Sequence, residues 1–232
     1  RLGQPSEQYA ADATNLPVVK DIASVYEQME DYANAYSFYA YAFQLSGSAD
    51  VALNDKAMAM HEKAMQAEIE YYEEVLAADP TNEEAAAILA QRKAEAAATV
   101  VASARARVEA NPTDAQLQFK YGQALFDAEQ YTEAIAPLQR ARTNPNIRIK
   151  SMLMLGKCYH AKKMVDMAIR QLEDADKELL TMDDTKKEVL YMIGVLYDEA
   201  GNKEKSIETL KAIYEVDYGY KDVAQKVESA YS

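Results

Sequence analysis

The chain has 232 residues, a formal net charge of −13 and a hydrophobic fraction of 49%. Only 7 glycines and 6 prolines occur among abundant Ala, Glu, Lys, Leu and Met, a composition typical of helical proteins. No window approaches the roughly 18 uninterrupted apolar residues of a membrane span, and a single cysteine excludes an internal disulfide framework.

Residues 1–15 are polar and weakly periodic, and we expect a flexible or loosely docked lead-in there. In residues 16–49, apolar side chains recur at helical spacing in two consecutive stretches, which predicts an N-terminal pair of antiparallel helices. Because the chain begins at Arg1 and not at a methionine, we expect that an upstream segment is removed or omitted. The location of the protein is therefore open between the cytoplasm, which we slightly favour, and the periplasm.

The segment 50–112 contains two long stretches without helix breakers, separated at Pro80. After Pro80, Thr81 and Glu84 match a capping box, in which a hydroxyl accepts from a backbone amide of the first helical turn. We therefore predict a long antiparallel helical hairpin, with about 30 residues in each helix. Two degenerate copies of the repeat described below are the alternative, because Pro80 and Pro112 lie about where such copies would end.

Antiparallel pairing about Pro80 predicts ion pairs between the two long helices. The expected partners are Glu68 and Glu70 with Arg92 and Lys93, and Asp55 with Arg105 and Arg107. Each exposed pair is worth about 0.2–1 kcal/mol, so these pairs set the register of the helices more than their stability. The alanine-rich hairpin also leaves open a homo-oligomer formed through it.

Residues 113–218 contain three copies of one pattern. A glycine lies between large apolar residues at Gly122, Gly156 and Gly194, with spacings of 156 − 122 = 34 and 194 − 156 = 38. A small residue and then a leucine follow each glycine at fixed distances: Ala134 and Leu138, Ala168 and Leu172, Ser206 and Leu210. Small residues at these positions let two antiparallel helices approach closely. Turns are predicted at 129–131, 162–164 and 201–202, and further capping boxes at Thr113 and Thr185.

This pattern resembles the tetratricopeptide repeat family, of bacterial type. The resemblance implies an all-α fold, a superhelical solenoid of antiparallel helix pairs, with the long hairpin inserted near its middle. Residues 16–49 align as another copy, in which Ala23 takes the place of the glycine. Residues 219–232 are predicted to form a short amphipathic helix that caps the open end of the solenoid.

Sequence signatures of enzymes and metal sites are missing. The chain has no GxGxxG, GxxxxGK[ST], HExxH or paired CxxC. His61 and His160 lie 99 positions apart, and Cys158 is expected on the packing side of its helix as a buried thiol. We therefore predict no enzyme, with no catalytic residue, no cofactor and no metal.

The resemblance implies that a protein or peptide partner lies against the first helix of each pair, on the concave face. The matching positions are the predicted partner-binding residues: Phe119, Gln123, Phe126, Lys150, Leu153, Lys157, His160 and Tyr191. Packing of the aromatic members against a neighbouring helix is the alternative. The clamp with which the family grips chaperone C-termini needs Lys and Asn at positions that here hold Phe119 and Gln123, so we do not expect that role.

The sequence thus favours a non-catalytic scaffold or adaptor that binds a partner on its concave face. The stretch between Glu133 and Asp166 has seven bases and no acid, which keeps open a nucleic-acid-associated factor using residues 140–163. The acidic net charge disfavours that alternative, because phosphate contacts supply most non-specific affinity. A third alternative is an accessory domain of a larger enzyme or of a secretion or assembly complex.

Overall fold

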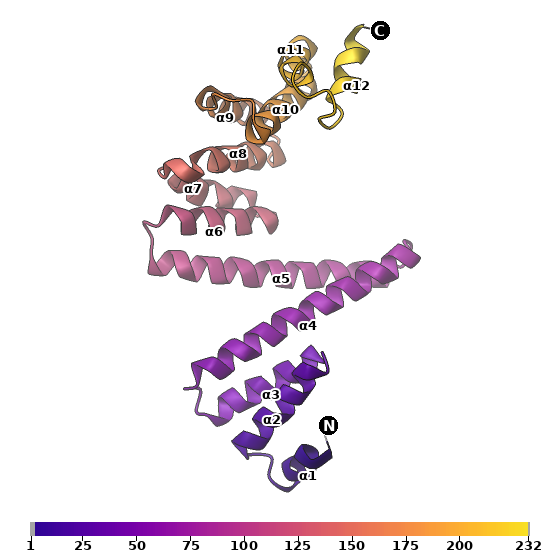
Figure 1. The fold of residues 1–232 in the computed structure, drawn as a ribbon, viewed down its shortest axis with the longest axis vertical. Helices are drawn as coiled ribbons and strands as arrows, with labels where there is room; N and C mark the ends of the chain where they lie inside the picture. Colours follow the sequence, from indigo (N-terminus) through magenta and orange to yellow (C-terminus); the bar gives the residue numbers. More distant parts are fainter. Residues whose placement is uncertain (1–2, 232) are drawn as a thin grey trace. The chain divides into compact units, whose positions relative to one another are not determined.

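The computed structural model describes residues 3–231, apart from the side chain of Gln4. Every regular element within this range is a helix, which confirms the predicted all-α class (Figure 1). None of the described helices combines the length and hydropathy required to cross a membrane. The chain divides into two compact units, Arg1–Ala96 and Ala97–Ser232, and the boundary lies inside helix α5.

The first unit contains α1 (Gly3–Ala11), α2 (Leu16–Gln28), α3 (Tyr32–Leu45), α4 (Val51–Ala78) and the first half of α5 (Glu83–Ala110). Helix α1 lies in the stretch for which a flexible or loosely docked lead-in was predicted. It packs beside α2, and the ring of Tyr9 meets that of Phe38 edge-on at 5.5 Å between centroids. An aromatic contact of this kind gives a polar segment a docking point that its weak periodicity does not reveal.

Helices α2, α3 and α4 enclose the core of the first unit. Ala23 is fully buried where the other copies have a glycine, and Tyr39 on α3 is 2% exposed. The Tyr39 hydroxyl donates to Glu27 at 2.6 Å and accepts from Lys56 Nζ at 3.2 Å. The buried phenol is thus fully partnered by α2 and α4, as a buried hydroxyl requires.

Helices α4 and α5 are 28 residues long each. Glu68 pairs with Arg92 at 2.6 Å, as predicted. One expected pair is wrong, because Lys93 meets Glu73 at 2.6 Å instead of Glu70. Arg105 pairs with Glu109 on its own helix. A pair four residues apart on one helix forms without help from a second helix.

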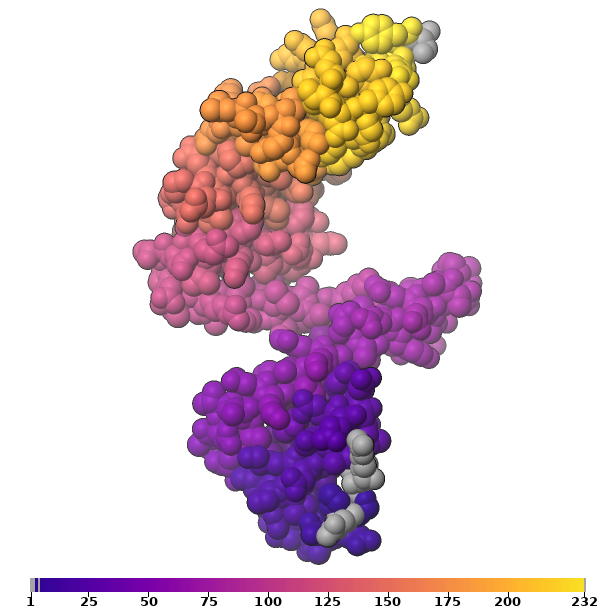
Figure 2. Space-filling view, in the orientation of Figure 1, coloured from indigo at the N-terminus to yellow at the C-terminus, as the bar shows by residue number. Residues whose placement is uncertain are grey.

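The second unit is a stack of antiparallel helix pairs, in which each helix packs against the next along the chain. Figure 2 shows the side chains of consecutive pairs in this unit packed against one another. The three pairs are α6 (Ala115–Asp127) with α7 (Tyr131–Ala141), α8 (Pro145–Ala161) with α9 (Val165–Glu178), and α10 (Asp184–Glu199) with α11 (Lys203–Tyr214). The short α12 (Val223–Glu228) follows, and its Val223 and Val227 are buried against Leu210 and Ile213.

The three repeat glycines lie where the two helices of each pair touch, which confirms their predicted role. A Cβ atom added to Gly122 would lie 2.6 Å from Leu138 Cγ. The same atom on Gly156 or Gly194 would lie 2.7 Å from the leucine that faces it. Real Cβ atoms do not come this close to another carbon, so the small residue sets the spacing of each pair.

The turn inside each pair places one residue in the left-handed region. The equivalent residues are Glu30 (φ 59), Glu129 (φ 59), Lys163 (φ 62) and Gly201 (φ 79). The residue that follows donates its amide to a carbonyl near the end of the first helix, as in the 2.8 Å bond from Asn202 to the carbonyl of Tyr197. This bond satisfies an orphan carbonyl at the helix end.

All three predicted capping boxes are displaced. A carboxylate or amide one or two positions from the threonine caps the helix in its place: Asn82 instead of Thr81, Asp114 instead of Thr113, and Asp183 instead of Thr185. Asn and Asp are better N-caps than Thr, and a negative charge also suits the positive end of the helix dipole.

Candidate functional site

The eight predicted partner-binding residues lie on α6, α8 and α10, the first helices of the three pairs. We call these eight residues, Phe119, Gln123, Phe126, Lys150, Leu153, Lys157, His160 and Tyr191, the first-helix face. Gln123 and Lys150 are exposed, and the other six are half-buried. The face is therefore accessible in part along each of the three helices.

The apolar members of the first-helix face are anchored in the core of the second unit. Phe119, Phe126 and Leu153 pack against its buried cluster. The ring of Phe126 also meets Tyr131 edge-on at 5.3 Å between centroids. From the sequence, these side chains were expected either to line a partner-binding groove or to pack against a neighbouring helix. In the structure they are half-buried, with one side on the core and the other open to solvent.

The basic members connect neighbouring helices. Lys157 on α8 pairs with Glu188 on α10 at 3.6 Å, and His160 Nε2 lies 2.8 Å from Glu199 on α10. Lys150 has no ion pair within residues 3–231. Of the three, Lys150 is thus the cation most available to a partner.

Tyr191 is held by the segment that leads into α12. Its hydroxyl donates to Asp222 at 2.8 Å, and Lys221 Nζ lies 4.2 Å from the centre of its ring. Lys221 also donates to Glu188, which accepts from the Tyr220 hydroxyl at 3.2 Å. We call these five residues, Glu188, Tyr191, Tyr220, Lys221 and Asp222, the C-terminal clasp.

The clasp holds its charges over the neutral pH range. Burial raises the pKa of Glu188, but the hydrogen bond from Lys221 and the positive charges of Lys221 and Lys157 outweigh it and hold this pKa below the ordinary value of 4.5. Burial, with the hydrogen bond to Asp222, raises the pKa of Tyr191 to about 12. At pH 7 the carboxylate therefore stays charged and the phenol stays neutral.

Tyr220, Lys221 and Asp222 were not predicted from the sequence. The signal that could have found them is an alternation of charge at nearly one-repeat spacing, from Lys157 to Glu188 to Lys221. Such an alternation pairs α8 with α10, and α10 with the segment before α12. It is weak in a chain that has 38 acids.

The groups that could carry covalent or metal chemistry are dispersed or inaccessible. Within residues 3–231, no group of three or more His, Cys, Asp or Glu side chains is placed to hold a metal ion. Cys158 is fully buried, and burial raises the pKa of its thiol to about 11. At neutral pH this thiol is protonated and shielded from reagents.

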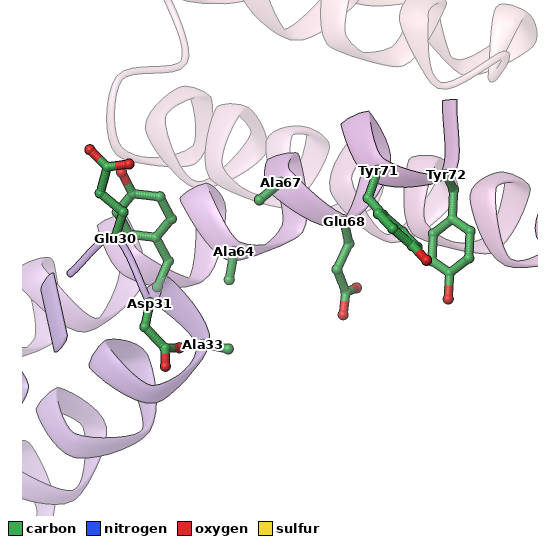
Figure 3. Close-up of a pocket in the computed structure, with 9 residues that line it drawn as sticks. Glu30, Asp31, Ala33, Ala64, Ala67, Glu68, Tyr71 and Tyr72 are labelled. Atoms are coloured by element: carbon green, nitrogen blue, oxygen red, sulfur yellow. The ribbon is translucent and has the colours of Figure 1, made fainter. Parts of the chain in front are cut away.

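A second surface feature, which the sequence analysis did not anticipate, lies in the first unit. A hollow of about 420 Å³ separates the turn before α3 from one side of α4 (Figure 3). It is lined by acids, tyrosines and alanines: Glu30, Asp31, Tyr32, Ala33, Ala64, Ala67, Glu68, Tyr71 and Tyr72. No basic residue is among them.

Comparison with known families and structures agrees with this geometry. The family model of the tetratricopeptide repeat matches residues 187–220, which contain α10 except its first three residues and all of α11. A comparison with curated proteins gave no significant match.

Solved structures share the fold at low sequence identity. The Naa15/Naa10 complex bound to HypK-THB matches all of this chain with a TM-score of 0.60 and 14% identity, and this chain covers 36% of the matched chain. The C-terminal part of a TPR repeat-containing protein from Cytophaga hutchinsonii matches 97% of this chain, with 93% of its own length, a TM-score of 0.53 and 16% identity. YrrB, a TPR protein, matches 98% of this chain, with 97% of its own length, a TM-score of 0.47 and 18% identity.

Proposed function

We propose that this chain, a tetratricopeptide repeat protein, is a non-catalytic scaffold or adaptor that binds a protein or peptide partner on its first-helix face. The observation that carries the proposal is the composition of that face. Exposed Gln123 and Lys150 lie on the same helices as the half-buried Phe119, Phe126 and Leu153. Partly open aromatic side chains beside polar groups are the usual anchors of protein interfaces.

The charges of the face favour a particular class of partner. A peptide with apolar anchors would cover the open sides of the aromatic residues, and an acidic group in it would meet Lys150. Lys157 and His160 contribute less, because their partners Glu188 and Glu199 already offset their charge. The partner we propose is therefore an extended or helical segment with apolar side chains and at least one carboxylate.

The test uses two variants with the same change in charge. The first variant, Gln123→Glu with Lys150→Glu, alters the two exposed members of the face. The control, Gln139→Glu with Arg170→Glu, alters exposed positions on the second helices α7 and α9. Each variant lowers the net charge by three, and neither replaces a buried side chain.

The wild-type chain is immobilised on beads and incubated with a nuclease-treated extract of the source cells. The captured proteins are identified by mass spectrometry. We expect the face variant to bind the captured partner at least tenfold more weakly and the control to bind it like the wild type. Equal binding by all three chains would contradict the proposal. A partner that is captured from an untreated extract but not from the nuclease-treated one would favour the nucleic-acid alternative in its place.

A further inference from the structure

The hollow in the first unit exists because α4 extends beyond the helix it packs on. Its core-facing residues Leu53, Ala57 and Met60 lie against α3, in the N-terminal part of α4. Farther along, Ala64 and Ala67 face the hollow together with Tyr71. Alanine side chains are too short to fill the space between α4 and the turn before α3, so a recess is left between these two elements (Figure 3).

The two ends of the hollow differ in chemistry. Figure 3 shows Glu30 and Asp31 at one end and Tyr71 and Tyr72 at the other, with the small side chains between them. Ala64 and Tyr71 are seven residues apart on one helix, which corresponds to about 10 Å. Because Ala64 lies between the two ends, a ligand that touches both ends spans more than this distance, at least about three residues of extended chain.

The acids of the hollow differ in whether they already have a hydrogen-bond or ion-pair partner. Asp31 accepts from the Asn34 amide and caps α3, and Glu68 lies 2.6 Å from Arg92 Nε. Glu30 is exposed, and no ion pair with it occurs within residues 3–231. Glu30 thus provides an open carboxylate at the acidic end.

The tyrosines at the other end favour a cation as well. Tyr71 is 60% exposed and meets Tyr72 edge-on at 5.1 Å between centroids, which leaves a face of its ring to solvent. A ring on the wall of this hollow already holds an ammonium group, because Lys63 Nζ lies 5.0 Å from the centre of Tyr32. Guanidinium groups stack on such rings and pair with carboxylates through the same planar group.

We propose that this hollow binds a basic peptide segment of a partner protein, with one cationic side chain on Tyr71 and another at Glu30. Charge complementarity favours this occupant, since three acids and three tyrosines line the recess. Lys63 on Tyr32 and Arg92 on Glu68 offset part of this charge and leave Glu30 and Tyr71 open. The surrounding sequence agrees, because the stretch 64–91 contains seven acids and no base. The site lies in the first unit, and the proposed function of the first-helix face in the second unit does not depend on it.

The probe is a fluorescein-labelled hexa-arginine peptide, and its binding to the full chain is measured by fluorescence anisotropy in 50 mM sodium chloride. The hollow variant carries Glu30→Gln and Tyr71→Ala. The matched control carries Glu208→Gln and Tyr218→Ala, which are the same chemical changes at exposed positions of the second unit. Because all four residues are exposed, both variants should fold, and circular dichroism checks this.

We expect the hollow variant to bind the probe about tenfold more weakly and the control to remain within twofold of the wild type. Tyr71→Phe alone, which keeps the ring, should bind like the wild type. Equal weakening in both double variants would overturn the proposal, since it would mean that only the overall negative charge attracts the peptide. Absence of probe binding to the wild type would overturn the proposal too. So would a dimer of the wild-type chain, seen in sedimentation and disrupted by Tyr71→Ala, because a second copy of the chain would then occupy the hollow.

Discussion

Gly156 on α8 and Leu172 on α9 are in such close contact that a Cβ atom on Gly156 would lie 2.7 Å from both Cγ and Cδ2 of the leucine. Both residues are buried, and Leu172 is fully inaccessible. The leucine cannot move outwards without disturbing the next pair. The contact therefore fixes how closely the two helices approach.

We predict that Gly156→Ala destabilises the chain. Overpacking of a core of this kind costs about 1–3 kcal/mol, while alanine returns about 0.5–1 kcal/mol of helix propensity. The net loss in the free energy of unfolding should be about 1–2 kcal/mol in urea titrations. Gly219→Ala is the control, because the nearest atom to its added Cβ would be 3.9 Å away. A Gly156→Ala chain as stable as the wild type would contradict the close contact.

Two turn residues at the same repeat position should respond in opposite directions. Lys163 has φ 62 and Gly201 has φ 79, and only glycine adopts this region without steric penalty. We expect Lys163→Gly to raise the free energy of unfolding by up to about 1 kcal/mol, and Gly201→Ala to lower it by about 1 kcal/mol. Urea titration of both variants measures the change. A loss of stability in both would argue against the left-handed turn at Lys163.

The buried phenol of Tyr39 should stabilise the first unit through its hydroxyl. Tyr39→Phe removes the partner of Glu27 and of Lys56 but keeps the ring. We expect a loss of about 1–2 kcal/mol in the free energy of unfolding, because Glu27 is left half-buried without its hydrogen bond. Tyr71→Phe, which alters an exposed ring, should change stability by less than about 0.5 kcal/mol. Equal effects of the two substitutions would contradict the hydrogen-bond network.

The C-terminal clasp should make stability depend on pH through Glu188. Its pKa in the folded chain lies below the ordinary value of 4.5, so its contribution is present above pH 4.5 and is lost as the pH falls through the folded pKa. At pH 7, Glu188→Gln should lower the melting temperature by about 2–4 °C relative to the wild type.

The difference between these two chains should shrink as the pH falls below about 4.5. Thermal melts at pH 7, 5 and 3.5 measure it, with Glu208→Gln on the exposed side of α11 as the control. A difference that stays constant over this range would show that the carboxylate of Glu188 is not held by the clasp.

The repeat architecture could be predicted because it rests on residues whose size alone decides the packing. Gly122, Gly156 and Gly194 have no side chain, and each faces a leucine sixteen residues later, so sequence spacing maps directly onto the helix contact. The turns followed for the same reason, since one helix must end before its partner begins. Both the size of these residues and their spacing along the chain can be read from a single sequence.

Helix caps and cross-helix pairs were predicted less well, because several neighbouring residues compete for the same role. Asn82 and Asp114 cap their helices in place of the adjacent threonines, and Lys93 pairs with Glu73 and not with Glu70. The members of each competing set differ by about 1 kcal/mol or less, so local geometry decides between them.

The hollow beside Tyr71 and the C-terminal clasp could not be predicted from the same patterns. The hollow depends on where α4 extends beyond α3, and this position is set by the lengths of the two helices and by how they pack. The clasp joins Tyr191 to Asp222, residues 31 positions apart and in no motif. Both features are properties of the assembled units.

Site-specific photo-crosslinking tests most directly whether a partner binds on the first-helix face. The photoreactive residue p-benzoylphenylalanine replaces exposed Gln123 on α6 or, as the control, exposed Gln139 on α7, and the chain is irradiated in the source cells. We predict a covalent adduct with a second, different protein from position 123 and none from position 139. Adducts from position 139 alone, or equal adducts from both positions, would contradict it.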